Sequence, residues 1–395
     1  MDASGYTARG FEGVRDAFAA AQSADEGGGQ LCIYRHGEKV VDLWAGRDKI
    51  NDRPYGQDII TIIMSCTKGA TATVVHRLAE RGLIDYEAPV ADYWPEFAAG
   101  GKADARIWHL LSHSVGLPGI DPADGLVAHD LMYAERHVPQ LAAMAPVWTP
   151  GASCHYHPIT YGSLLGEVVR RVTGKRVSQV FAEEIAGPLG LDFWIGNLPE
   201  SEEPRVAPHF STGPELTGEM IEAMLTAVGI DVSTRLAQVV VGSFKHTGQL
   251  IVDMNNREGR MAEVPAGNGV ADAASLARMY AAIIGEVDGV RLLKPETVEA
   301  ARTLRTGAMQ PAGDLGKLPL GPPTEYGLGF EFAKAPLPML GPGSFGHAGA
   351  GGRIGFAHPE SGVAAAYVAN TMLTVPAGPD PRWSWMGELA QAVSA

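Results

Sequence analysis

Cysteine is scarce in this sequence, with only Cys32, Cys66 and Cys154 among 395 residues. Three scattered thiols give neither a disulfide framework nor the paired spacing of a zinc site. Long apolar runs are also missing, since no stretch reaches the about 18 residues that span a membrane. The N-terminal MDASGYTARGFEGVRDAF has no basic region followed by an apolar run. We therefore expect a cytoplasmic protein without a membrane partner.

Basic residues are outnumbered, because 45 aspartates and glutamates face 31 lysines and arginines and leave a net charge of -14. A charge of this sign repels phosphate backbones and anionic lipids, which excludes nucleic acid as an expected partner. Hydrophobic residues make up 46% and charged residues 19% of the chain, as in ordinary globular proteins. At about 150 residues per domain, the length allows two or three compact units or one large domain with insertions.

The first half of the sequence passes from a helix to strands and then back to helices. Residues 9–24 have helical spacing, and glycines 27–29 predict a flexible loop. The β-rich runs around residues 36–37 predict a hairpin that begins an antiparallel sheet. A long helix is expected over residues 65–82, and mostly helical segments follow it. Residues 200–262 give no interpretable topology.

The second half returns to strands after one more helix. The closing segment WSWMGELAQAVSA predicts a last helix, so helices flank the sheet at both ends of the chain. We expect an α/β fold of the α+β type, with an antiparallel sheet and a large, mostly helical insertion. The segments behind this prediction are a helix at 269–284, strands at 326–332, 352–357 and 363–370, and a surface loop at 316–327.

Ser65-Cys66-Thr67-Lys68 is the one S-x-x-K string in the chain. A serine that opens a helix lies near the positive end of the helix dipole, and a residue three positions later projects from the same face. Lys68 can therefore reach Ser65 and, if burial lowers its pKa, remove the hydroxyl proton. The alternative is a serine N-cap followed by a surface lysine.

Tyr156 precedes a helix that is expected to start near Thr160. A phenol held between cations can have a lowered pKa and pass a proton to a leaving group. The alternative is a loop tyrosine that packs its ring on the core. The flanking His155 and His157 form an H-x-H pair, but no third ligand stands at a matching spacing, so we expect no metal and no other cofactor.

The glycine-rich run from Gly346 to Gly352 allows close approach of the backbone to a ligand, and a backbone N–H there could face a developing oxyanion. A plain glycine turn is the alternative. A Walker-type phosphate loop is excluded, because the Gly-Lys-Ser/Thr ending is missing. No serine stands in G-x-S-x-G, which argues against an α/β-hydrolase. His109 and His113, four apart on an expected helix, are interpreted as structural.

Together these three segments resemble the serine hydrolases of the class C β-lactamase and penicillin-binding-protein superfamily, most closely the family VIII carboxylesterases. The resemblance runs from about Gln30 to Asn370 and includes WHLLSHSVGLPG, PGASCHYHPITYG and GHAGAGGRIGFAHPE. It implies a β-lactamase/transpeptidase-like fold, in which residues 1–64 and 265–395 form an α/β domain. Residues 65–264 would form a mostly helical domain, with the helix of the nucleophile at the junction.

The resemblance also implies roles for individual residues. Ser65 would attack the carbonyl, Lys68 and Tyr156 would share the proton transfers, and the N–H groups of Ser65 and Ala350 would form the oxyanion hole. His347 and Gly349 would contact the substrate as the third family motif. The triplet starting at His246 also reads H-x-G, but it precedes the helix at 269–284, whereas the family motif follows that helix.

Two departures from the lactamase pattern bear on the substrate. Pro158 replaces the asparagine of the tyrosine motif, and His347, mostly neutral near pH 7, replaces a lysine that attracts an anionic carboxylate. Both favour a neutral small-molecule ester, so we expect a carboxylesterase acting on short acyl esters, with β-lactam hydrolysis weak or absent. One alternative is an acyltransferase using an alcohol or amine acceptor. Another is a non-catalytic binding protein of the same fold, against which intact Ser65, Lys68 and Tyr156 argue.

Overall fold

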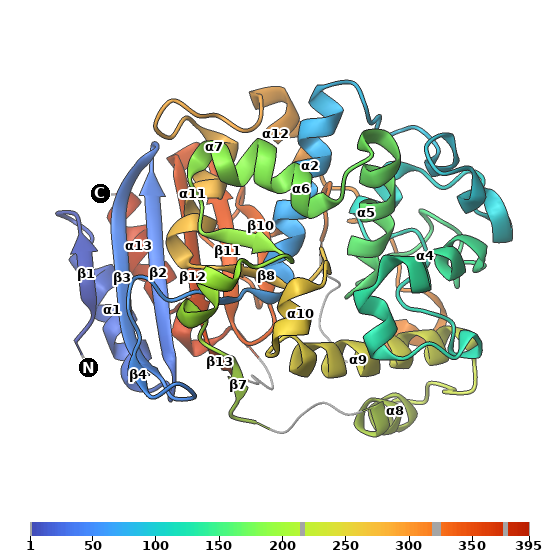
Figure 1. Cartoon of the computed structure of the whole chain (residues 1–395), viewed down its shortest axis with the longest axis horizontal. Coiled ribbons are helices and arrows are strands. Elements are labelled where there is room, and N and C mark those ends of the chain that lie inside the picture. Colours follow the sequence, from blue (N-terminus) through green and yellow to red (C-terminus); the bar gives the residue numbers. More distant parts are fainter. Residues whose placement is uncertain (1, 214–217, 318–324, 374–377, 395) are drawn as a thin grey trace.

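The computed structural model describes residues 2–213, 218–317, 325–373 and 378–394. Its centre is an antiparallel eight-stranded sheet in the order β1-β3-β2-β12-β11-β10-β9, with β4 pairing to β3 (Figure 1). Two smaller sheets have the orders β5-β8-β6 and β13-β7. The strands are β1 (Ser4–Thr7), β2 (Gly28–Arg35), β3 (Glu38–Asp48), β4 (Arg53–Pro54), β5 (Thr61–Ile62), β6 (Phe193–Ile195), β7 (Phe210–Ser211), β8 (Gly269–Ala271), β9 (Glu331–Phe332), β10 (Phe345–Gly349), β11 (Arg353–His358), β12 (Val363–Ala369) and β13 (Thr371–Met372).

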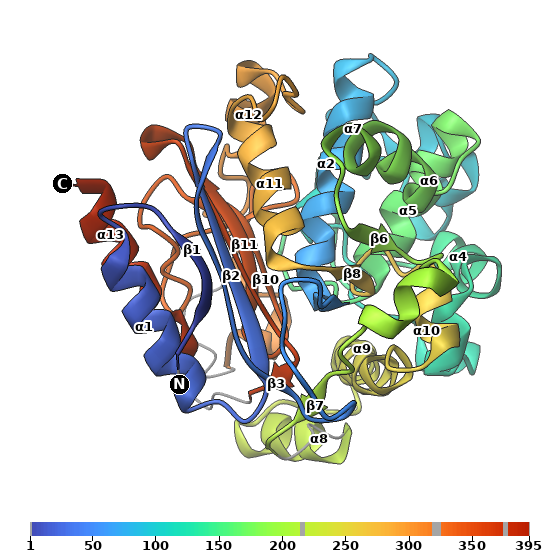
Figure 2. The same cartoon turned by 60° about the vertical axis from the view of Figure 1, so that its left-hand side comes forward.

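Helices cover both faces of the main sheet (Figure 2). The first and last helices, α1 and α13, pack on one face, and α11 and α2 lie on the other, toward the helical part of the molecule. The helices are α1 (Glu12–Ser23), α2 (Thr67–Glu80), α3 (Ile107–Leu111), α4 (Ala134–Ala143), α5 (Thr160–Thr173), α6 (Val177–Phe181), α7 (Gly187–Leu189), α8 (Gly218–Ala227), α9 (Arg235–Asp253), α10 (Arg257–Met261), α11 (Ala273–Ile284), α12 (Pro295–Ala301) and α13 (Trp385–Ser394).

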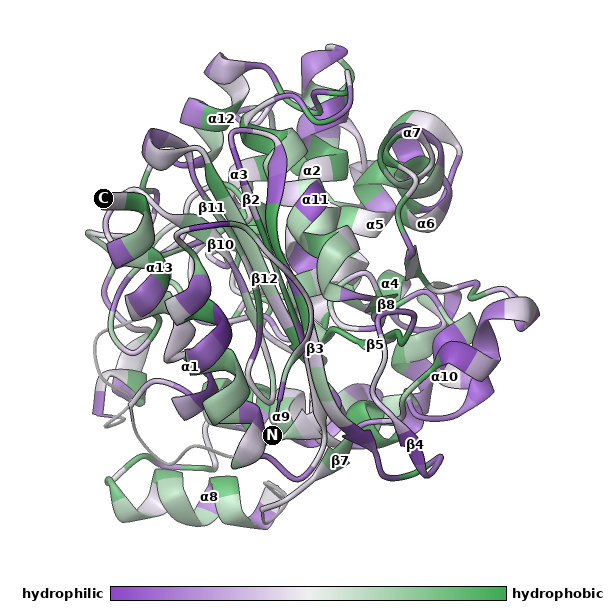
Figure 3. Ribbon diagram, turned by 90° about the vertical axis from the view of Figure 1, so that its left-hand side faces the viewer, coloured by the Kyte–Doolittle hydropathy of each residue, from purple (hydrophilic) through white to green (hydrophobic). Residues whose placement is uncertain are grey.

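The two faces of the sheet enclose separate apolar cores. Under α1 and α13, the side chains of Phe18, Tyr367 and Trp385 are fully buried in one cluster. The other face shares a larger cluster with α2, α5 and α11. Figure 3 shows the same layering, with hydrophobic colour on the strands and hydrophilic colour on the outer side of α1. The predicted fold class, an antiparallel sheet flanked by the terminal helices with a helical insertion, is confirmed.

The predicted hairpin is present as β2 and β3, and it turns at His36 and Gly37, which have φ values of 50° and 83°. The predicted loop at glycines 27–29 is wrong, because Gly28 and Gly29 belong to β2. A Cβ atom on Gly28 would lie 2.1 Å from the Tyr55 ring. The absence of a side chain at Gly28 therefore serves close packing inside a sheet and not loop flexibility.

The helical part differs from the prediction in three places. The helix expected over residues 269–284 begins with strand β8, and α11 starts only after Asp272, whose side chain accepts a hydrogen bond from the Ser275 N–H at 2.6 Å. His113 lies beyond the end of α3 with a φ of 58°. Residues 200–262, left without a topology, contain α8, α9 and α10. Part of the predicted loop at 316–327, residues 318–324, lies outside the described residues.

Among residues 2–213, 218–317, 325–373 and 378–394, no helix is both long and apolar enough to cross a membrane.

Candidate active site

Ser65 stands in a short 3-10 turn, Met64–Cys66, immediately before α2. Met64 adopts a φ of 52°, a left-handed conformation that costs free energy in a residue with a side chain. The helix therefore begins two residues later than the sequence suggested, at Thr67, and Lys68 lies in its first turn. The Ser65 side chain is partly exposed, while that of Lys68 is fully buried.

The Lys68 amine makes three hydrogen bonds. Its Nζ donates to the backbone carbonyls of Pro158 and Ala266, both at 2.8 Å, and lies 3.2 Å from Ser65 Oγ. Burial lowers the pKa of Lys68 to about 7, although the negative charge of Glu331 acts in the opposite direction. A neutral amine has two N–H groups and one lone pair. The two carbonyls take both N–H groups, so the lone pair is left for the Ser65 hydroxyl proton.

Tyr156 approaches Ser65 from the loop before α5, and its hydroxyl donates to Ser65 Oγ at 2.7 Å. Its ring lies 4.7 Å from Lys68 Nζ, measured to the ring centre. The expected lowering of the Tyr156 pKa is wrong, because burial and the Glu331 carboxylate raise this pKa well above its usual value. Tyr156 is therefore a neutral hydroxyl that can donate a proton, and Lys68 is the better base.

The third segment forms β10 and the turn that follows it. Gly349 lies directly against the turn of Ser65, where a Cβ atom would be only 2.5 Å from the Ile63 carbonyl oxygen. Ala350 follows in the turn between β10 and β11 and faces the same cavity as Ser65. In the part of the chain that the structure describes, neither the Ser65 N–H nor the Ala350 N–H has a protein acceptor. Both donors are available to a ligand oxygen.

His347 is buried in β10, and its ring centre lies 6.1 Å from that of Tyr156. Its Nδ1 donates to the Ala348 carbonyl at 2.7 Å and lies 3.7 Å from Glu331 Oε2. Burial and the nearby Lys68 charge lower the pKa of His347 to about 3. The imidazole is thus neutral, with a proton on Nδ1 and a bare acceptor at Nε2.

Glu331 is a buried acid that the sequence analysis did not identify. It stands in β9, and its Oε2 accepts the Ala348 N–H at 2.9 Å. Ala348 lies in β10 beyond the residues that pair with β9, so the carboxylate takes the place of a strand partner for this N–H. Burial raises the pKa of Glu331 to about 7. A single acid within the apolar run LGFEF was the available signal, but only the fold brings that acid to Lys68 and His347.

Two histidines hold the loop of Tyr156. His113 Nδ1 accepts the His157 N–H at 3.1 Å, and its ring packs 5.0 Å from the Tyr156 ring, measured between ring centres. The His157 ring donates from Nδ1 to the His155 carbonyl at 2.6 Å and accepts the Leu117 N–H at Nε2. Both nitrogens of His157 are therefore occupied, and within the described residues no group of three or more metal-ligating side chains gathers.

A small apolar cavity of about 30 Å³ opens beside Ser65. Its outer wall comes from α9, in the part of the sequence that gave no topology. No charged side chain is among the lining residues, which are Met64, Ser65, Pro158, Ile159, Thr247, Ile251, Met254, Ala266, Gly267 and Ala350.

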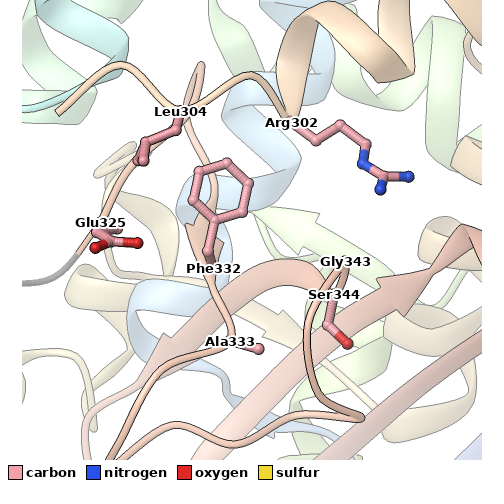
Figure 4. Close-up of a pocket in the computed structure, with 7 residues that line it drawn as sticks. All are labelled: Arg302, Leu304, Glu325, Phe332, Ala333, Gly343 and Ser344. Atoms are coloured by element: carbon pink, nitrogen blue, oxygen red, sulfur yellow. The ribbon is translucent and has the colours of Figure 1, made fainter. Parts of the chain in front are cut away.

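A second hollow lies beside β9, around Arg302, Phe332 and Ser344 (Figure 4). Phe332 follows Glu331 in the strand, so the two side chains leave opposite faces of the sheet. The Arg302 guanidinium is paired with the carboxylates of Glu299 and Glu360. None of the described residues that line this hollow also lines the cavity of Ser65.

A serine that lines an apolar cavity, with a lysine and a tyrosine hydrogen-bonded to its hydroxyl, between a helical part and an antiparallel sheet, defines a penicillin-binding-protein-like serine hydrolase. The family model described as beta-lactamase matches residues 14–385, and the chain belongs to this family. The predicted resemblance is thereby confirmed.

Proteins similar to this chain are named as esterases and as penicillin-binding-protein homologs. Esterase/beta-lactamase LipL from Mycobacterium tuberculosis is 39% identical over 358 residues, which cover 88% of this chain and 78% of that protein. The crystal structure of a family VIII carboxylesterase matches with a TM-score of 0.82 and 34% identity, over 100% of this chain and 99% of that one. A penicillin-binding protein homolog from Caulobacter crescentus matches with a TM-score of 0.81 and 34% identity over 100% of both chains.

Proposed function

We propose that this protein is a carboxylesterase that cleaves short-chain esters through an acyl-enzyme on Ser65. The observation that carries the proposal is the position of Ser65 Oγ between the Lys68 amine and the Tyr156 hydroxyl. The amine has a pKa near neutrality and both of its N–H groups engaged, so its lone pair can take the serine proton.

Acylation would begin when Ser65 Oγ attacks the ester carbonyl and its proton moves to Lys68 Nζ. The carbonyl oxygen becomes an oxyanion, which the N–H groups of Ser65 and Ala350 would stabilise. When the bond to the alcohol oxygen breaks, Tyr156 gives its proton to that oxygen and regains one from Lys68. The alcohol leaves neutral, and a water molecule then repeats the same transfers in reverse order to release the acid.

Neutral esters should be better substrates than β-lactams. The cavity lining carries no charged side chain, and neutral His347 gives no attraction to the carboxylate of a lactam. We expect turnover of p-nitrophenyl acetate and butyrate, with kcat/KM for a chromogenic cephalosporin about 10–150-fold lower, since a lost contact with a charged group costs about 1.5–3 kcal/mol. A higher kcat/KM for the lactam would contradict the proposal. Product analysis with added alcohol distinguishes hydrolysis from acyl transfer.

The wall formed by α9 should limit the length of the acyl chain. Replacing Ile251→Ala removes a side chain that lines the cavity beside Ser65. We expect the preferred p-nitrophenyl ester to become longer, with octanoate gaining about 10-fold on acetate in kcat/KM, because added methylenes gain about 0.8 kcal/mol each when buried. Val252→Ala, on the same helix but half exposed, is the matched control and should leave the preference unchanged. An unchanged preference in both variants would place the acyl chain elsewhere.

A further inference from the structure

The turn between β10 and β11, residues 350–352, has each of its three carbonyl groups hydrogen-bonded to a side chain. The Ala350 carbonyl accepts from Arg353 Nη1 at 3.0 Å, and the Gly351 carbonyl accepts from Arg382 Nη2 at 2.5 Å. The Gly352 carbonyl accepts from Trp383 Nε1 at 2.8 Å. We call Arg353, Arg382 and Trp383 the carbonyl clamp. A trans peptide directs its C=O and N–H to opposite sides, so these bonds fix the three peptides that follow Ala350. The peptide that carries the Ala350 N–H has the Gly349 carbonyl, which accepts the N–H of the clamped Gly352 at 3.2 Å, so the clamp reaches the Ala350 N–H through Gly352.

Arg353 also reaches the strand that leads to the nucleophile. Its Nε donates to the Ile62 carbonyl at 3.2 Å, and Ile62 stands three residues before Ser65. The same guanidinium therefore binds both chain segments that carry the proposed oxyanion hole, one before Ser65 and one at Ala350. A further bond to the Thr371 carbonyl, 3.4 Å from Nη1, connects it to β13.

The charge of Arg353 is not matched by a contacting carboxylate. Arg382 is paired with Asp25 at 2.9 Å and with Asp380 at 2.7 Å, but no ion pair among the described residues includes Arg353. The Arg353 side chain is fully buried, and its Nη2 has no hydrogen-bond partner in the described part of the chain. Burying an unpaired charge costs free energy of folding. A role in stability alone therefore does not explain why a guanidinium stands at this position.

We propose that Arg353 is a positioning residue of the reaction, which orients the Ala350 N–H toward the oxyanion and adds an uncompensated positive charge behind it. This inference rests on the proposed function. The planar guanidinium suits the position because it donates to several carbonyls at once, whereas a lysine ammonium is a single, more strongly hydrated point charge. Arg382 and Trp383 complete the clamp, and Asp25 and Asp380 hold Arg382.

The inference is tested with three variants: Arg353→Met, Arg353→Lys and Trp383→Phe. Removing an oxyanion-hole donor outright lowers kcat by about 10²–10³-fold, so loss of its positioning in Arg353→Met should lower kcat by about 10–100-fold, with KM within about twofold. Arg353→Lys should fall between this variant and the parent. Trp383→Phe removes only the donor to Gly352 and should lower kcat by a few fold. If Arg353→Met does not fold, the kcat of Trp383→Phe tests the positioning role of the carbonyl clamp.

Binding of phenylboronic acid, measured by calorimetry, separates positioning from a general structural effect. The acid forms a tetrahedral adduct on serine, so its affinity should fall in step with kcat, whereas a structural role would lower only the melting temperature. Arg15→Met is the matched control, because Arg15 binds the carbonyls of Ala3 and Gly5 on the far side of the sheet. It should leave both quantities unchanged.

The possible outcomes separate this inference from the proposed function. Folded Arg353 and Trp383 variants that keep kcat and boronic acid affinity within about twofold of the parent would overturn the inference. An effect on KM alone would overturn it equally. An inactive parent, or a Ser65→Ala variant as active as the parent, would instead overturn the proposed function.

Discussion

Ser65→Ala should lower kcat/KM for p-nitrophenyl butyrate by about 10⁴-fold or more, because it removes the oxygen that we propose as the nucleophile of the acyl-enzyme. Since catalytic groups act as a unit, little further loss is expected when Lys68→Met is added to this variant. The measurement is initial-rate kinetics at saturating and subsaturating ester, with the rate without enzyme subtracted.

Ser361→Ala is the control for Ser65, because among the described residues the Ser361 hydroxyl bonds within its own turn, to His358. It should keep the parent kcat/KM. The fold of Ser65→Ala should be intact, since the Ser65 hydroxyl contacts only Lys68 and Tyr156 in the described structure. A Ser65→Ala variant with the parent rate would show that the nucleophile is another residue.

Lys68→Met should lower kcat/KM by about 10²–10⁴-fold, the usual contribution of a general base. The side chain of methionine fills a similar volume, but it cannot take the serine proton. Lys102→Met is the matched control, because Lys102 is also fully buried, with its Nζ bonded to the carbonyls of Ala99, Ala142 and Met144. The control should lose stability and keep the kcat/KM of its folded fraction, so equal rate losses in both variants would contradict the role of Lys68.

The pKa of Lys68 should set the pH dependence of kcat/KM in the parent enzyme. Lys68 must be neutral to accept a proton, and burial lowers its pKa to about 7. The value of kcat/KM should therefore rise with pH through about 7 and reach a plateau above it. The facing titratable groups are Glu331, His347, Tyr156 and Cys66, of which Glu331 also has a pKa of about 7. Glu331→Gln removes a negative charge and should move the rise to lower pH; an unmoved profile would exclude Glu331 as its electrostatic partner.

The motifs gave the site in outline because they are local in the sequence. The spacing of Ser65 and Lys68 brings their side chains together across the turn that leads into α2, and the sequence order of the three segments follows the family pattern. The sequence could not show that the helix starts at Thr67, because the strained φ of Met64 depends on tertiary contacts. It also could not give the sign of the Tyr156 pKa shift, which follows from burial.

Other parts of the site come from segments far apart in the chain. Glu331 reaches Ala348 because β9 pairs with β10, and the carbonyl of Ala266 reaches Lys68 across 198 positions. The outer wall of the cavity comes from α9, where the H-x-G triplet starting at His246 is set aside as a motif and gives no sign of a cavity wall. Pro158, which stands where the family has an asparagine, contributes its backbone carbonyl, a group that every residue type carries. Such contacts are set by the fold and not by local spacing.

The central claim is that an acyl group is transferred to Ser65. Acid quenching during turnover of p-nitrophenyl acetate, followed by peptide mapping in a mass spectrometer, tests it most directly. We expect one acetyl group on Ser65, present in the parent and absent from Ser65→Ala. An acetyl group on another side chain, or continued turnover with no acetylated peptide detected under conditions that trap a known acyl-enzyme, would contradict it.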